Sequence, residues 1–115
     1  MAAEPVTTQS PNGLTLVVTL HAHAGQEPGL RAYEKQAMAV LREHGGRLDK
    51  VIRVEASLDA GPVPHEVHIV WFPSEAHFAS YRDDPRLADL APLRAQAIKA
   101  TSVLVGREAD TYGGA

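Results

Sequence analysis

The clearest pattern in the chain is an alternation of residue types between positions 14 and 23. One set of alternate positions holds Leu14, Leu16, Val18 and Leu20, and the other holds Thr15, Val17, Thr19, His21 and His23. Side chains of a strand point alternately to the two faces of a sheet. The segment therefore predicts a strand whose leucine face packs on helices, and whose Thr/His face looks to the opposite side.

A helical pattern follows, beginning near Pro28. Proline lacks a backbone N–H, but the first N–H groups of a helix have no partner within the helix, so this absence costs no hydrogen bond there. Apolar and aromatic positions recur at helical spacing, at Leu30, Tyr33, Ala37, Leu41 and His44. The charged residues Arg31, Glu34, Lys35, Arg42 and Glu43 are expected mostly on other faces. Gly45 and Gly46 predict the end of the helix, because glycine adopts the left-handed conformation at little cost.

The remaining elements follow from strand and turn signals. Strands are predicted at 48–58, at about 65–72 and at 101–107, with a turn at 59–64. Pro73 stops the third strand and Ser74 is a good N-cap for a helix that carries Phe78 and Tyr81. Pro85 interrupts this helix, and a second helical piece is expected from about Arg86 to Ala100.

The order of elements is β-α-β-β-α-β, which is typical of the ferredoxin-like α+β fold. That fold has a four-stranded antiparallel sheet with its helices on one face. The other face is expected to be apolar too, since Val67, Ile69 and Trp71 lie on one side of the third strand and Val70 and Phe72 on the other. An exposed apolar face usually marks a partner, and we expect a homodimer in which two sheets enclose a shared barrel.

Composition limits the range of functions. The 115 residues predict one domain at 13–108, between flexible tails at 1–12 and 109–115. A formal net charge of −3 gives no reason to expect nucleic acid as a partner. The start has no signal peptide pattern and no apolar run is long enough to cross a membrane, so a cytoplasmic protein without membrane partners is expected. The absence of Cys excludes thiol nucleophiles and Cys-ligated metals.

Several short motifs, in this order and spacing, resemble those of a known group of proteins. They are His44-Gly45-Gly46-Arg47, Phe72-Pro73-Ser74, Tyr81, Asp84-Pro85, Leu93-Arg94 and Val103-Leu104-Val105-Gly106. Over residues 14–108 the chain resembles the dimeric α/β-barrel superfamily and, within it, a widespread bacterial family of unknown function. The resemblance implies the ferredoxin-like fold and the dimer. It does not select a reaction, because the superfamily includes cofactor-free monooxygenases, lactone isomerases, polyketide cyclases and haem-degrading enzymes.

The candidate catalytic residues are His21, His23 and Arg94. The two histidines share a face with Thr19, which we assign to the barrel interior, and imidazoles there would support acid–base catalysis. The alternative is that they lie in solvent at the end of the strand. Arg94 lies four residues from both Leu90 and Ile98, on or beside the buried face. It would either clamp a carboxylate or enolate, or form an ion pair with Asp83, Asp84 or Glu55.

The candidate substrate-binding residues are Thr19, Tyr81, Trp71 and Arg53. Tyr81 would offer its hydroxyl to a ligand, although it and Trp71 also suit a core. Arg53 shares a face with Glu55, either inside the pocket or as a solvated pair at the sheet edge. A metal site would need a third ligand beside His21 and His23, which only His65, His68 or Glu55 could supply, so no metal is expected.

No cofactor is expected either. The stretch from Arg86 to Ala100 has no His, and Asn12 lies ahead of the first strand, which departs from the haem-degrading pattern. Phosphate-binding glycine loops are absent. Two hypotheses remain: a cofactor-independent monooxygenase, isomerase or cyclase acting on a small apolar or aromatic metabolite, or a non-catalytic dimeric protein that binds such a ligand.

Overall fold

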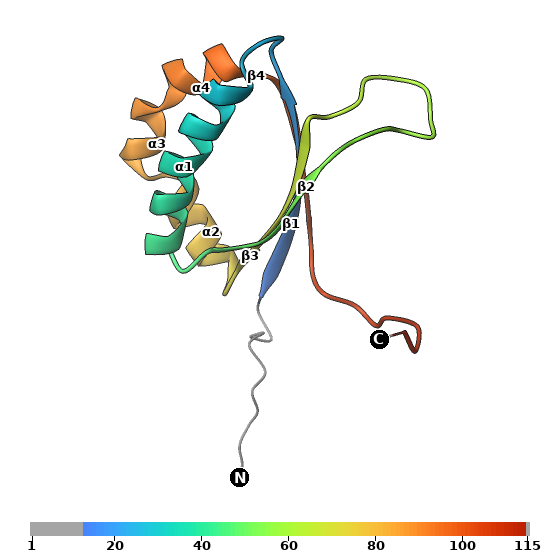
Figure 1. Cartoon of the computed structure of the whole chain (residues 1–115). Helices are drawn as coiled ribbons and strands as arrows, with labels where there is room; N and C mark the ends of the chain where they lie inside the picture. The colour runs from blue at the N-terminus through green and yellow to red at the C-terminus, as the bar shows by residue number, and fades with distance from the viewer. Residues whose placement is uncertain (1–12, 115) are drawn as a thin grey trace.

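One antiparallel sheet of four strands organises the computed structural model, which describes residues 13–114. The strands are β1 (Leu14–Ala22), β2 (Arg47–Arg53), β3 (Glu66–Phe72) and β4 (Ile98–Gly106), in the order β2-β3-β1-β4. The helices are α1 (Glu27–Glu43), α2 (Glu75–Arg82), α3 (Pro85–Asp89) and α4 (Ala91–Ala97). All four lie on the same side of the sheet (Figure 1). The predicted ferredoxin-like α+β fold is confirmed.

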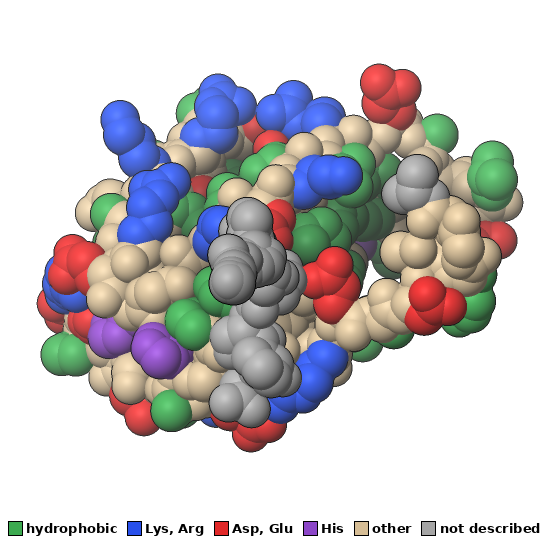
Figure 2. Space-filling model, turned by 90° about the horizontal axis from the view of Figure 1, so that it is seen from below, with side chains coloured by type: hydrophobic (Ala, Val, Ile, Leu, Met, Phe, Trp, Pro, Cys, Tyr) green, Lys and Arg blue, Asp and Glu red, His purple; other side chains and the backbone are tan. Residues whose placement is uncertain are grey.

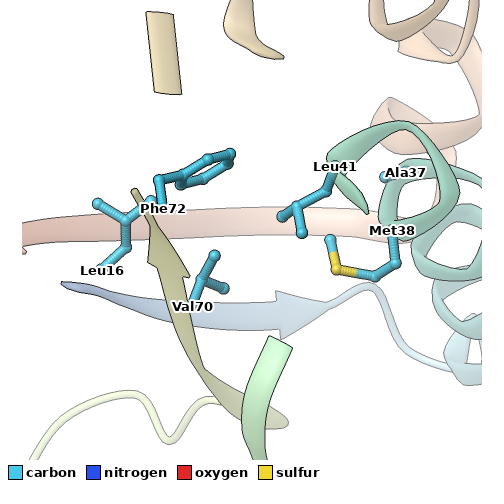
Figure 3. Close-up of a cluster of buried hydrophobic side chains, with 6 residues drawn as sticks. All are labelled: Leu16, Ala37, Met38, Leu41, Val70 and Phe72. Atoms are coloured by element: carbon cyan, nitrogen blue, oxygen red, sulfur yellow. The ribbon is translucent and has the colours of Figure 1, made fainter. Parts of the chain in front are cut away.

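The leucine face of β1 packs on the helices, as predicted. Its central cluster consists of Leu16, Ala37, Met38, Leu41, Val70 and Phe72, whose side chains come from the sheet and from α1 (Figure 3). A second cluster at the other end of β1 consists of Leu20, Leu30, Ala97 and Ile98. The hydrophobic effect at these two clusters holds α1 and α4 against the sheet.

The second strand is shorter than predicted, because β2 ends at Arg53 and not at Leu58. Arg53 is the last residue paired with β3, opposite Glu66, and only the Val54 N–H still bonds to the His65 carbonyl. Residues 54–65 then form a long loop that projects on the helix-free side of the sheet (Figure 1). Two prolines and a glycine at positive φ in this loop prevent regular pairing.

The predicted helical piece at 86–100 is also different in the structure. It divides at Leu90 into α3 and α4, because Pro92 in the first turn of α4 has no N–H to continue an earlier helix. Residues from Ile98 onward are not helical, since Ile98 pairs with Ala22 and starts β4. This pairing buries Ile98 beside Leu20 and Leu30, which outweighs its helical spacing.

Residues 109–114 add little to the fold. The predicted tail at 1–12 and Ala115 lie outside the described residues, and residues 109–114 are exposed without helix or strand. Within residues 13–114, no helix has both the length and the apolar character that crossing a bilayer requires.

The end of α1 depends on two adjacent glycines with different tasks. Gly45 has φ +78°, the left-handed conformation predicted for it. Gly46 allows close packing, because a Cβ there would lie 2.5 Å from Leu41 Cδ2 and 2.8 Å from Phe72 Cε1. Both neighbours are fully buried, so neither side chain has space to move away.

We therefore expect Gly46→Ala to destabilise the protein by about 1–3 kcal/mol through overpacking. Chemical denaturation measures this as a lower free energy of unfolding. Gly29→Ala is the matched control, because the added Cβ would make only ordinary contacts, 3.4 Å from Gln26 Oε1 and 3.6 Å from Ala97 Cβ, and should be neutral or stabilising. An unchanged denaturation midpoint for Gly46→Ala would show that this contact does not constrain the fold.

Candidate functional site

A cavity of about 270 Å³ lies between the helices and the sheet of a single chain. Most of its wall is apolar, formed by Val18, Met38, Leu41, Val70, Phe78, Leu87 and Val103. The polar residues that border it are Tyr33, Glu34, His68, Tyr81, Arg82, Arg94 and Thr101. An apolar cavity with a few convergent polar groups is the usual form of a small-molecule site.

Glu34 reaches this cavity because of its position on α1. It lies one turn from both Leu30 and Met38, which are buried, so it shares their face. The prediction that Glu34 belongs mostly with the exposed charges is wrong. A carboxyl group placed on the core face of a helix needs a partner.

The partner of Glu34 is His68, which is only 3% exposed. His68 lies on the helix side of β3, two residues before Val70. Its Nδ1 is 3.8 Å from Glu34 Oε1, and its Nε2 is 3.0 Å from Glu66 Oε1. Glu66 in turn accepts a hydrogen bond of 3.2 Å from Nη2 of Arg53, whose side chain is largely exposed. A series of ionisable side chains, each in contact with the next, therefore runs from the surface to the cavity.

The pKa values of the two carboxyl groups, Glu34 and Glu66, are shifted in opposite directions. Burial raises the pKa of Glu34 above its ordinary value, and the proximity of Glu66 adds to this while His68 and Arg94 oppose it. Burial also acts to raise the pKa of Glu66, but hydrogen bonds from His68 and Arg53 together lower it. Glu66 is thus an ionised acceptor, so His68 carries a hydrogen on Nε2 and turns Nδ1 toward Glu34.

Two tyrosines and an arginine border the same space. Burial raises the pKa of Tyr33 and of Tyr81, and Glu34 adds to both shifts while Arg94 opposes them. A hydrogen bond between Tyr33 and Arg94 contributes to this opposition. Both phenols therefore stay protonated over the physiological range and are available as hydrogen-bond donors.

Arg94 borders the cavity, although the residue is exposed. None of its expected acidic partners holds it among the described residues. Asp84 instead binds His44 at 2.8 Å and Arg86 at 2.9 Å, and it caps α3. The guanidinium of Arg94 is therefore a cation at the cavity rim, with Tyr33 as its neighbour.

The structure does not bring His21 and His23 to this cavity. His21 follows the buried Leu20 on β1 and points to the helix-free face, while His23 is exposed beyond the strand end. The predicted grouping of these histidines with Arg94 is therefore not formed within one chain.

The other predicted binding residues also divide between the two sides. Thr19 lies on the helix-free face, 2.6 Å from the hydroxyl of Ser102. Trp71 lies on that face too, beneath the guanidinium of Arg47. Arg53 does not line the cavity and is linked to it only indirectly, through Glu66, which bonds to His68 at the cavity wall. Tyr81 alone among the predicted binding residues borders the cavity directly.

The residues that sequence reasoning missed are Glu34, Glu66 and His68. The sequence Val67-His68-Ile69-Val70-Trp71-Phe72 contains a pattern that could have identified His68. The histidine alternates with Val70 and Phe72, so all three side chains lie on the same face of the strand. A polar residue in phase with a core face is a candidate for a paired, functional position. Among residues 13–114, no three His, Asp or Glu side chains are arranged to hold a metal ion.

Comparison with known proteins agrees with this architecture. A family model for a domain of unknown function, DUF1330, matches residues 16–107. The chain is thus a ferredoxin-like α+β protein with an internal cavity, and it belongs to the DUF1330 family. No curated protein matches the sequence.

Solved structures show the same fold at low sequence identity. The RPA0582 protein of unknown function from Rhodopseudomonas palustris has a TM-score of 0.77 at 15% identity, over 90% of this chain and 87% of that one. SnoaB, a cofactor-independent oxygenase from Streptomyces nogalater, has a TM-score of 0.67 at 12% identity, and the match covers 90% of this chain and 99% of SnoaB. A nipsnap family protein with unknown function from Agrobacterium tumefaciens has a TM-score of 0.64 at 23% identity, and the match covers 87% of this chain and 91% of that protein.

The raised pKa of Glu34 predicts a pH-dependent stability. Folding favours the protonated carboxyl, so the native state loses stability as the pH rises through the folded pKa of Glu34. Glu34→Gln removes this loss and should raise the free energy of unfolding near neutral pH. The difference from the original chain should shrink as the pH falls toward the ordinary Glu value, as urea unfolding at a series of pH values would show.

Glu43 provides a control of opposite sign. The Arg86 guanidinium lowers the pKa of Glu43. The ionised Glu43 side chain therefore stabilises the folded state above the ordinary Glu pKa, and this stabilisation is lost as the pH falls through the folded pKa. Glu43→Gln should therefore lower stability near neutral pH, slightly, because the pair is exposed. A pH-independent gain for Glu34→Gln would contradict the assignment.

Proposed function

We propose that this protein is a cofactor-independent enzyme that acts on a small apolar or aromatic metabolite inside the cavity between helices and sheet. The class would be monooxygenation, isomerisation or cyclisation. The observation that carries the proposal is the convergence of Tyr33, Glu34, His68, Tyr81 and Arg94 on a cavity whose wall is mostly apolar. These residue types supply proton transfer and stabilisation of negative charge without a metal or cofactor.

In the proposed chemistry, the Glu34–His68 pair accepts a proton from an acidic C–H or O–H of the substrate. The raised pKa of Glu34 supports this role, because a more basic carboxylate is a better proton acceptor near neutral pH. Glu66 orients His68 through the bond to Nε2 and would stabilise the imidazolium that results. Arg94, with the phenols of Tyr33 and Tyr81, would hold the enolate or phenolate left behind.

We also propose that the protein is a homodimer through the helix-free face of the sheet. Apolar side chains from all four strands lie on that face, among them Val17, Ile52, Ile69 and Leu104. Leu104 is 68% exposed in the single chain. Figure 2 shows a recess with a hydrophobic wall toward the right, the side where Figure 1 shows no helices. The buried indole N–H of Trp71 on this face has no acceptor among the described residues.

The enzymatic proposal predicts a strong effect of His68→Gln. Phenols and enolisable ketones would be incubated with the protein, with conversion followed by mass spectrometry and oxygen uptake. For any compound converted, we expect a loss of about 10²–10⁴-fold in turnover, because a general acid–base group is removed. His21→Gln is the matched control and should retain full turnover, since His21 lies on the other face.

A ligand that is retained by the natively purified protein but never converted would favour the alternative function, a non-catalytic binding protein with the same cavity. Equal losses for both histidine variants would contradict the assignment of the site to the cavity.

The dimer proposal predicts that Leu104→Asp produces a monomer. The substitution adds a charge to the apolar face but costs the isolated chain little, because Leu104 has few contacts there. Sedimentation at micromolar concentration would measure the association state. Ala39→Asp on the exposed side of α1 is the control and should leave a dimer. A monomer in the unmodified protein would end the proposal.

A further inference from the structure

A second hollow of about 340 Å³ adjoins the cavity at the edge between α1 and β2. We call it the basic groove. Its rim carries Arg31, Lys35 and Arg42, and its apolar floor includes Leu48 and Val51. Figure 2 shows Lys and Arg side chains gathered along one edge of the molecule.

The three cations are aligned on one stripe of α1. Arg31 and Lys35 are one helical turn apart, and Arg42 follows two turns later. The described residues offer none of them an ion-pair or hydrogen-bond partner. Other arginines are engaged, for example Arg94 with Tyr33 and Arg86 with Glu43. Unpaired cations beside apolar surface are a feature of sites that bind organic anions.

The groove and the cavity meet at the proposed acid–base pair. Glu34, Met38 and His68 line both hollows. A ligand with its charged end in the groove would therefore place its adjoining atoms beside His68 Nδ1 and Glu34. Glu66 also lines the groove, so two carboxyl groups reduce its positive charge. A small net positive charge suits a singly charged carboxylate better than a phosphate dianion.

We propose that the substrate is an aromatic or apolar monocarboxylate, with its acid group held by Arg31 and Lys35, one helical turn apart, and its apolar body in the cavity. Arg42 lies two turns further along α1 and adds to the positive charge of the groove. This inference rests on the proposed function, because it assigns the substrate class of the same site. The acid group fixes the orientation, so that the carbon next to it faces the Glu34–His68 pair. Burial of the apolar body supplies most of the affinity.

The test uses 3-phenylpropionate and its neutral analogue 3-phenylpropionamide as probes, at millimolar concentration, with backbone amide shifts followed by NMR. The acid should bind more tightly than the amide and should shift the amides of residues in both hollows. Arg31→Ala/Lys35→Ala should weaken binding of the acid about fivefold, which is the combined effect of two exposed charge pairs. The same variant should leave binding of the amide unchanged.

Lys50→Ala/Lys99→Ala is the matched control, because it removes two cations outside the groove and should not alter binding of the acid. Equal loss in both double variants would overturn the inference, since only net charge would then matter. If acid and amide bind the cavity equally well, the carboxylate assignment falls while the proposed function stands. If neither probe shifts any residue of the cavity or groove, the inference and the cavity assignment both fall.

Discussion

The burial of His68 in an apolar strand is the constraint on which the site depends. An imidazole that is 3% exposed must have its polar atoms satisfied, because an unpaired buried polar group costs about 1–3 kcal/mol. Glu66 satisfies Nε2, and this places a carboxylate in the core that itself requires Arg53 at the sheet edge. Glu34 then faces Nδ1 from α1. One buried histidine thus determines three further charged positions.

The cavity lies beside α1, which packs on the sheet through two clusters of buried side chains. At one end, Leu30 packs with Leu20 and Ile98, and at the other Leu41 packs against Phe72. The absent side chain of Gly46 allows the second contact, since even a methyl group would collide with Leu41. The cavity borders these packed residues, and Glu34 and His68 face each other at its wall. Rigid support of this kind is what a preorganised site requires.

Much of the fold could be predicted because local chemistry and global packing agree. The leucines of β1 alternate with period two, Gly45 takes the left-handed conformation that ends α1, and Ser74 caps α2 through the His77 N–H. The failures occur where tertiary pairing overrides local pattern. Ile98 has helical spacing from Leu90 and Arg94, but pairing with Ala22 draws it into β4.

The candidate site was less predictable, because alternation along β1 identifies two faces without showing which of them borders a cavity. The sequence predicts that the Thr/His face lines the interior of a barrel shared by two copies, and this stays a prediction. The cavity of the single chain lies on the leucine side, where apolar residues both fill the core and line the opening. Charge alone groups Glu34 with the residues expected mostly on other faces of the helix, and only its one-turn spacing from Leu30 and Met38 shows its direction. Periodicity reports the direction of a side chain, but it does not report whether the space there is filled.

The two faces of the sheet carry different kinds of surface. All residues of the cavity and of the basic groove come from one chain and from the helix side. The helix-free face contributes exposed Leu104 and the unsatisfied N–H of Trp71, but no residue of the proposed acid–base pair. A second copy on that face would cover apolar surface and add rigidity to β1 and β3, whose backbones carry the cavity wall. Association would then support the site through the sheet, and the chemistry would remain within each chain.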